Sequence, residues 1–175
     1  TDKKYESYSK ITIEEIAKLP VRGFKERGIT KQVCEFFDVK VSYDEDGVID
    51  AHYYPYDNAT HYKRRKLPKS FDWIGGGGTI FGIDKFSQGG KRLVITEGEL
   101  DALSVAQANM DKYNKIYPVI SLSSAVATEV FIARREWLRS FNEVILFLDN
   151  DEPGEEAKKR LIHIIGVDKI KVVQH

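Results

Sequence analysis

Four acidic residues have the types and spacing of a site for phosphate chemistry. Glu97 and Asp101 lie just after one apolar segment, and Asp149 and Asp151 lie just after another, one residue apart. Clustered carboxylates repel one another unless a counter-charge is present. Magnesium takes one or two carboxylates and keeps water and phosphate oxygens as its other ligands. These residues therefore predict a magnesium site that serves phosphodiester chemistry.

The elements that would position these acids alternate between strand and helix along residues 91–175. This order is typical of a parallel sheet with right-handed crossovers. Functional groups gather at the carboxyl ends of such strands, so Glu97, Asp149 and Asp151 should point toward one edge. Asp101 lies one helical turn after Glu97 and should face the same cleft. The predicted strands are 92–96, 117–121, 143–148 and 169–173, and the predicted helices are 99–109, 128–140 and 153–165.

Two glycines beside the acids are expected to serve the same site. Gly98 leaves space for a phosphate to approach the backbone. Gly154 permits a tight turn into the following helix, whose N-terminus can favour an anion. Both glycines extend the predicted phosphate site beyond its carboxylates.

Residues 1–90 are less regular and rich in Tyr, Lys and Gly. Thr12 and Glu15 have the capping-box spacing of a helix start, and that helix should end near Pro20. Thr30 is expected to cap a second helix, and 44–47 forms a turn before strands at 47–56 and 60–66. The residues expected on the buried face of the second helix are Val33, Phe36 and Phe37.

The densest charge run is Lys63–Lys66, in the last of these strands. Alternation along a strand places Lys63 and Arg65 on one face. One interpretation is a solvated edge strand protected by its charges, and the other is contact with phosphates. Nearby tyrosines can pack in the core or stack on bases. These tyrosines are Tyr53, Tyr54, Tyr56 and Tyr62.

Composition excludes several classes of protein. The chain has 175 residues and a net charge of zero, so any nucleic-acid surface must be local. Its single cysteine, Cys34, allows neither an internal disulfide nor a cysteine-rich zinc site, and we expect it to be buried. No apolar run approaches the roughly 18 residues of a membrane helix. Gly75–Gly78 lacks the Lys and Ser/Thr of a P-loop, so no ATP-driven motor is expected. Because the chain begins at Thr1, we expect a fragment of a longer intracellular protein.

The two acidic motifs resemble those of the Toprim domain, which primases, topoisomerases and some nucleases share. Thr96–Asp101 resembles the family's first motif, and Leu148–Gly154 resembles its DxD motif. The resemblance is closest to the primase domain of phage primase-helicases and Twinkle-like proteins. In those proteins an "RGI" segment and a Lys-rich strand precede the Toprim domain. Here Arg27–Ile29 and Tyr62–Lys66 correspond to them, followed by Lys69–Phe71.

The resemblance implies an α/β fold: a Toprim-like Rossmannoid parallel sheet at 91–175 with a smaller basic α+β subdomain at 1–90. It implies that Glu97 is the catalytic glutamate, as a general base or metal partner. Asp149 and Asp151 would hold Mg²⁺, for which Mn²⁺ can substitute, and Asp101 would support the cluster. The residues implied to bind nucleotide phosphates or template are Lys63, Arg65, Lys69 and Arg27.

The implied function is that of a DNA primase core, which makes short RNA primers from ribonucleoside triphosphates on single-stranded DNA. A fused or associated helicase domain and a zinc-binding module would lie outside this chain, and no membrane is involved. The implied location is intracellular, in the host cytoplasm for a phage protein or the mitochondrial matrix for a Twinkle-like one. Ser121–Ser124 departs from the family's Gly-containing loop. We expect the Toprim domain, and a further acidic residue, to continue beyond His175.

Three other functions remain open from the sequence. A Toprim nuclease would use the same acids with water as nucleophile. A Twinkle-like protein would use the domain as a non-catalytic DNA-binding arm of a helicase. A phosphatase or response-regulator-like domain would need a Lys at a later strand end, a role that Lys169 and Lys171 fit poorly.

Overall fold

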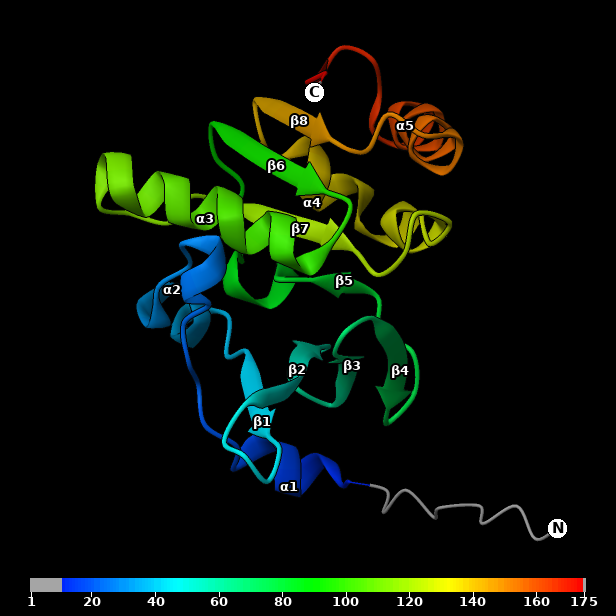
Figure 1. Ribbon diagram of the computed structural model, residues 1–175. Coiled ribbons are helices and arrows are strands. Elements are labelled where there is room, and N and C mark those ends of the chain that lie inside the picture. The colour runs from blue at the N-terminus through cyan, green and yellow to red at the C-terminus, as the bar shows by residue number, and fades with distance from the viewer. Residues whose placement is uncertain (1–10, 175) are drawn as a thin grey trace, which may run out of the picture.

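The protein contains two β-sheets joined through one hydrophobic core. The computed structural model describes residues 11–174. The four-stranded sheet β1–β4 lies below the five-stranded sheet in the view of Figure 1, and the chain enters the upper sheet through β5. The lower sheet lies within the predicted subdomain 1–90, but the upper sheet begins with β5 at Ile80, before the predicted boundary. The division at residues 90 and 91 stays a prediction.

The lower sheet is antiparallel, with strands in the order β1-β2-β3-β4. Thr12 begins the first helix as predicted, since its hydroxyl accepts from the backbone N–H of Glu15 at 3.1 Å. The Asp44 carboxylate accepts from two backbone N–H groups of the predicted turn, at 2.9 Å each. The elements are α1 (Ile13–Ala17), a 3-10 helix (Lys25–Arg27), α2 (Lys31–Phe36), β1 (Lys40–Tyr43), β2 (Ile49–Tyr56), β3 (His61–Lys66) and β4 (Ser70–Ile74).

The prediction for α2 is wrong in one detail. Phe36 is 37% exposed, whereas Val33 and Phe37 are buried as expected. Cys34 takes a position on the buried face instead, which confirms that the thiol is buried. Thr30 is the N-cap residue, but its hydroxyl donates to Gln107 on a later helix at 2.9 Å rather than capping α2.

The upper sheet has the order β5-β7-β6-β8-β9. Its last four strands in the chain are parallel, as predicted, and β8 is an interior strand. The wholly parallel sheet that we expected is corrected at one edge, where β5 pairs antiparallel with β7. The elements are β5 (Ile80–Phe81), a 3-10 helix (Ile83–Lys85), β6 (Arg92–Thr96), α3 (Glu99–Tyr113), β7 (Val119–Leu122), a 3-10 helix (Glu129–Arg134), α4 (Arg135–Arg139), β8 (Glu143–Phe147), α5 (Glu152–Ile165) and β9 (Ile170–Val172).

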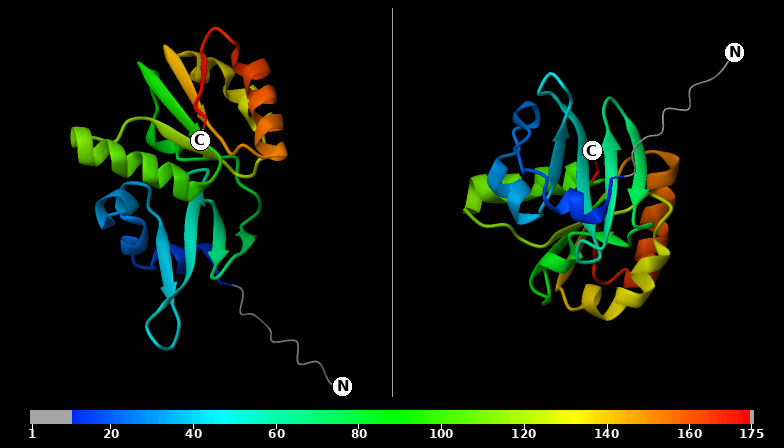
Figure 2. Two further views of the ribbon diagram at one scale, coloured as in Figure 1. Left: turned by 45° about the horizontal axis from the view of Figure 1, so that its top comes forward. Right: turned by 90° about the horizontal axis from the view of Figure 1, so that it is seen from below.

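Helices cover both faces of this upper sheet. Figure 2 shows α3 on one side of the strands and α4 and α5 on the other. The single helix expected at 128–140 is a 3-10 helix followed by the short α4. Among the described residues, no helix has the length and apolar character needed to cross a membrane.

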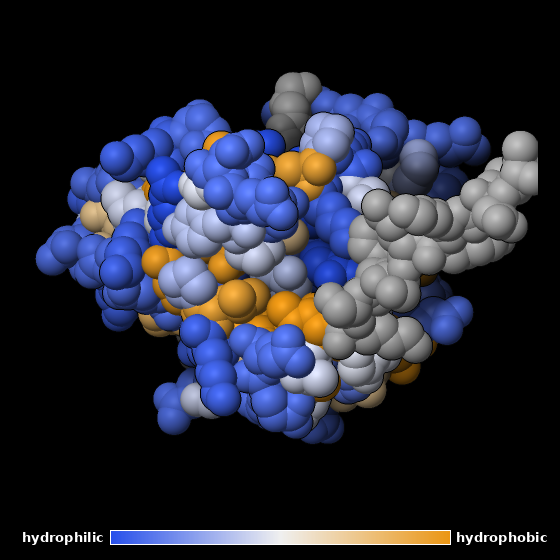
Figure 3. Space-filling model, turned by 60° about the horizontal axis from the view of Figure 1, so that its bottom comes forward, coloured by the Kyte–Doolittle hydropathy of each residue, from blue (hydrophilic) through white to orange (hydrophobic). Residues whose placement is uncertain are grey.

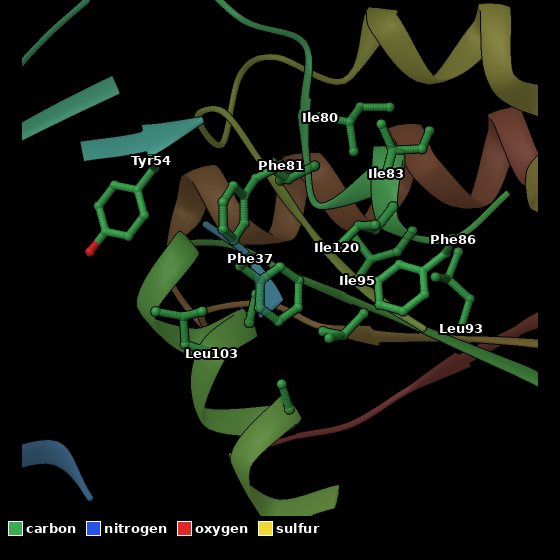
Figure 4. Packing of buried hydrophobic residues seen from close by; sticks show 14 of the residues in the cluster. Phe37, Tyr54, Ile80, Phe81, Ile83, Phe86, Leu93, Ile95, Leu103 and Ile120 are labelled. Atoms are coloured by element: carbon green, nitrogen blue, oxygen red, sulfur yellow. The ribbon is translucent and has the colours of Figure 1, made fainter. Parts of the chain in front are cut away.

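One buried cluster unites the two sheets. Figure 4 shows Phe37 and Tyr54 of the N-terminal part packed near Phe81, Leu103 and Ile120 of the upper layer. Rings of Phe37 and Phe81 stack with centroids 5.5 Å apart. The tyrosines at 53, 54, 56 and 62 are at most 3% exposed, so core packing, not base stacking, is their role. Because the sheets share this core, the position of one constrains the other.

Candidate active site

The three carboxylates predicted to bind metal do converge. Glu97 follows β6, and Asp149 and Asp151 follow β8. These strands are parallel neighbours, with Thr96 opposite Phe147, so their carboxyl ends lie side by side. One oxygen from each of the three carboxylates lies within 4.8 Å of the others. The exposure of Asp149 and Asp151 leaves the group open to a ligand from solvent.

The acidic loop is fixed against the start of α5. Asp151 is the N-cap of this helix, and its Oδ1 accepts from the backbone N–H of Gly154 at 2.8 Å. A Cβ at residue 154 would lie 2.0 Å from the carbonyl oxygen of Asp149, which is far inside van der Waals contact. Gly154 therefore allows the loop to pack closely on the helix, which agrees with the tight turn that we predicted.

A buried lysine that sequence reasoning missed holds the same loop. Lys158 is 5% exposed on α5. Its ammonium donates to Asn150 Oδ1 at 3.1 Å and to Glu155 Oε1 at 2.7 Å. Asn150 lies between Asp149 and Asp151, so Lys158 orients the segment that carries both carboxylates. Its i, i+3 spacing from Glu155 was readable as a helical ion pair, but its reach to Asn150 was not.

The surroundings of Glu97 disfavour its negative charge. Burial, the hydrogen bond with Asp149 and the negative charges of Asp149 and Asp151 raise the pKa of Glu97 to about 7. Its Oε1 is buried and has no hydrogen-bond partner among the described residues. Both observations describe a negative charge that lacks compensation, which a divalent cation would supply.

Gly98 and Asp101 lie beside this cluster. Gly98 is the N-cap of α3, and a Cβ there would contact only Asp101 Oδ2, at 3.5 Å, among the described atoms. The predicted open approach to the backbone is thus present. Asp101 is exposed on the first turn of α3 but is not one of the three carboxylates that converge.

Lys63 is in a buried network rather than free on the surface. Its ammonium lies 2.9 Å from Glu99 Oε1 and donates to the backbone oxygen of Ser123 at 2.8 Å. The Lys63 and Glu99 side chains are 13% and 6% exposed. The Tyr56 hydroxyl also donates to Glu99, at 2.5 Å. Glu99, which sequence reasoning passed over, therefore joins β2 and β3 to the first turn of α3.

Of the other predicted basic residues, Arg65 lies beside Lys63 against the same Phe71 ring, and Lys69 and Arg27 lie outside the strands. The guanidinium carbon of Arg65 lies 5.6 Å from the Phe71 ring centroid, and Arg65 Nε is buried without a hydrogen-bond partner in the described part of the chain. Lys69 is exposed between β3 and β4, and Arg27 is exposed at the end of a 3-10 helix. Figure 3 shows the molecule from the side of this subdomain, where hydrophilic residues cover most of the visible face and hydrophobic residues show in several places between them.

The lysines near β9 do not face the acids. Lys169 donates to the backbone oxygen of Phe141 at 3.1 Å, and Lys171 pairs with Glu143 at 3.0 Å. Glu143 opens β8, at the end opposite the acidic loop. This placement argues against a phosphoacceptor Asp paired with a later Lys.

The mostly parallel sheet, with three carboxylates at the carboxyl ends of adjacent strands, is the arrangement that the resemblance to the Toprim domain implied. Residues 94–175 match the family model described as Toprim-like, and this part of the chain has that fold.

Among known proteins, the chain is 28% identical over 152 residues to a DNA helicase/primase of Enterobacteria phage T3. The match covers 83% of this chain and 26% of the relative, so the chain spans about a quarter of that protein's length.

Solved structures agree with this relationship. The primase fragment of the bacteriophage T7 primase-helicase superposes with a TM-score of 0.80 at 27% identity, covering 100% of this chain and 73% of that one. A second structure holds T7 primase domains bound to an RNA/DNA hybrid and dTTP, in a complex with the T7 lagging-strand DNA polymerase. It superposes with a TM-score of 0.73 at 29% identity, covering 89% of this chain and 80% of that one. The Aquifex aeolicus primase shares the fold: it superposes with a TM-score of 0.59 at 15% identity, covering 85% of this chain and 47% of that one.

Proposed function

We propose that this chain is the catalytic core of a DNA primase, which synthesises short RNA primers on single-stranded DNA as part of a primase-helicase. The observation that carries the proposal is the convergence of Glu97, Asp149 and Asp151 within 4.8 Å at one sheet edge. The relatives support it, because the matched regions belong to a phage helicase/primase and a primase fragment.

Mg²⁺ is the cofactor that we propose, with Mn²⁺ as a substitute. The residues fit it: three carboxylates offer hard oxygen ligands, and one of them has a buried oxygen without a partner. The three carboxylates would hold the ion, and Asp101 would support them from α3. A bound divalent cation would neutralise charge on the triphosphate as nucleotidyl transfer proceeds.

The chain's own residues would then bind and orient the reactants. In the transfer, a 3′-hydroxyl bonds to the α-phosphorus of the incoming nucleotide and pyrophosphate leaves. Glu97 is our proposed acceptor of the hydroxyl proton. Gly98, with its open backbone, gives a phosphate room to approach the cluster.

The basic residues of the N-terminal part are proposed to contact phosphates of the nucleotide or the template. Two of the three N–H donors of Lys63 are used, by Glu99 and Ser123, so one remains for a phosphate. Arg65 has a buried, unpaired Nε that an anion would satisfy. Lys69 and Arg27 are exposed, so both can contact phosphates of a DNA template that moves past the site.

The partners that we propose are single-stranded DNA, ribonucleoside triphosphates, and a helicase domain and zinc-binding module outside this chain. The relatives' names support the helicase, and the Aquifex aeolicus structure contains a zinc-binding domain. We place the protein inside the cell because its relative is a phage helicase/primase; no comparison supports the mitochondrial matrix.

The test is extension of a short RNA primer on a DNA template, because a supplied primer removes the need for start-site selection. We expect Asp149→Asn to reduce Mg²⁺-dependent extension by about 100-fold or more, since a metal site contributes several kcal/mol to such steps. Glu129→Gln, at an exposed acid on another element, is the matched control. Equal extension by wild type and Asp149→Asn overturns the proposal. Cleavage of labelled DNA with Mn²⁺ and no nucleotides would instead indicate a nuclease.

A further inference from the structure

A groove lies at the end of the upper sheet opposite the acids. It has a volume of about 620 Å³ and is lined where β6 begins, by Lys91 and Arg92, and where α3 ends, by Tyr113. Figure 1 shows the arrowheads of β6 and β8 at one end of the sheet and the last turns of α3 at the other. Since β6 has five residues, the two ends are separated by roughly 17 Å. The groove is thus distinct from the carboxylate cluster.

The charge of this groove is positive. Three cations line it, Lys91, Arg92 and Lys115, and no acidic residue is among the described residues that do so. Arg92 has a neighbouring anion, since its Nε lies 3.3 Å from Glu143 Oε2, but Glu143 is also paired with Lys171 at 3.0 Å. The net charge of the chain is zero, so this excess is local and favours an anionic occupant.

The groove also presents two exposed aromatic rings. Tyr113 and Tyr117 are 54% and 42% exposed, and their centroids lie 5.6 Å apart in an edge-to-face arrangement. Each ring has its own cation: Lys112 Nζ lies 5.2 Å from the Tyr113 centroid, and Lys115 Nζ lies 5.4 Å from that of Tyr117. Buried tyrosines elsewhere in the chain serve the core, whereas these two leave large areas in contact with water.

We propose that this groove binds a single-stranded nucleic acid. Two ring–cation pairs side by side match a polymer in which flat bases alternate with phosphates, because each ring can stack on a base while its lysine contacts the backbone. An acidic peptide would satisfy the lysines but gives no comparable partner to the two rings. The proposal does not rest on the catalytic role of the acids.

Fluorescence anisotropy of a labelled oligothymidylate, in EDTA to silence cation-dependent binding, tests the site. We expect Tyr113→Ala/Tyr117→Ala to raise Kd about tenfold or more, while Tyr113→Phe/Tyr117→Phe keeps the rings and changes it less than about twofold. Lys91→Glu/Lys115→Glu should raise Kd at least about tenfold and flatten the slope of log K against log salt by about 1.4. Reversing two exposed lysines on other faces, Lys31→Glu/Lys159→Glu, is the charge-matched control.

Three results would overturn the proposal that this groove binds nucleic acid. The first is a wild-type Kd for oligothymidylate in both the double-alanine and the double-glutamate variant of the groove. The second is an equal rise in Kd in the groove lysine variant and in the charge-matched control. An oligoglutamate peptide that binds equally tightly, with no dependence on the tyrosines, would identify a protein-docking surface and also overturn it. Asp149→Asn separates the two proposals: it should reduce primer extension by about 100-fold or more and leave oligothymidylate binding in EDTA unchanged. Thermal melting of each variant confirms that the exposed substitutions leave the fold intact.

Discussion

Replacing Lys63 by Met should destabilise the fold strongly, because it leaves Glu99 charged and buried. The pair is separated by 2.9 Å, and the Glu99 side chain is only 6% exposed. After the change, the Tyr56 hydroxyl is the remaining donor to Glu99 that the structure shows. Removing one partner of a buried ion pair costs about 3–5 kcal/mol. We therefore expect Lys63→Met to lower the free energy of unfolding by about that amount.

Urea denaturation followed by circular dichroism at pH 7 measures this effect. Lys63→Met/Glu99→Gln removes both charges and should recover about 2 kcal/mol or more of the loss, giving a double-mutant coupling energy of that size. Lys31→Met is the matched control: its pair with Glu35 is exposed on α2, with side chains 66% and 54% accessible, so its loss should cost about 0.5 kcal/mol or less. If Lys63→Met costs no more than Lys31→Met, the buried bridge does not stabilise the junction between the sheets.

Three further predictions concern the loop and the core. Gly154→Ala should cost about 1–3 kcal/mol in a melting experiment and weaken Mg²⁺ binding, because its Cβ would displace the carbonyl of Asp149. Lys158→Met should weaken Mg²⁺ binding by about tenfold or more in calorimetry, since it removes the hydrogen bond from Lys158 to Asn150 between the acids. Burial lowers the pKa of His52 to about 4, so the unfolded chain binds a proton between pH 6.5 and 4 that the native state does not. Stability should therefore fall as pH drops through this window, by up to about 3 kcal/mol, and His52→Gln should remove that part of the slope.

A control variant or a pH profile tests each of these three predictions. Gly77→Ala is the control for the glycine, because nothing lies within 4 Å of its Cβ position and its φ is not positive. Equal Mg²⁺ affinity in Gly154→Ala and Gly77→Ala would show that the loop tolerates the added carbon. Lys159→Met, one residue along α5 and exposed, is the control for Lys158. A pH profile of unfolding that is identical in wild type and His52→Gln would show that the imidazole is not held neutral.

The sequence predicted the upper sheet well because its signals are local. The apolar runs at 92–96 and 143–148 form β6 and β8, the latter ending one residue early at Phe147, and their parallel pairing brings Glu97 and Asp149 together. The order of the strands in the sheet sets where a residue that directly follows a strand lies along the sheet edge. The convergence of the acids could therefore be deduced once the alternation of strands and helices was recognised.

The features that escaped prediction are those set by distant contacts. β5 has only two residues, too few for any periodicity, and forms because β7 offers it an edge. Phe36 looked apolar enough to be buried, but the smaller Cys34 occupies the interior. Lys63 was assigned to the correct strand, yet its partner Glu99 lies 36 positions later in the chain, and no local pattern indicates which carboxylate a lysine will meet.

The first acidic motif directs its two glutamates toward different parts of the protein. Gly98, in an extended conformation with φ −124°, separates Glu97 at the end of β6 from Glu99 at the start of α3. Glu97 joins the carboxylate cluster, and Glu99 is anchored to Lys63 of the N-terminal sheet. Because only one residue separates them, we expect a shift of β3 relative to α3 to move Glu97 as well. The basic strand proposed to contact phosphates is therefore mechanically linked to the acids proposed to hold the metal, and Lys63→Met should impair primer extension even where the protein remains folded.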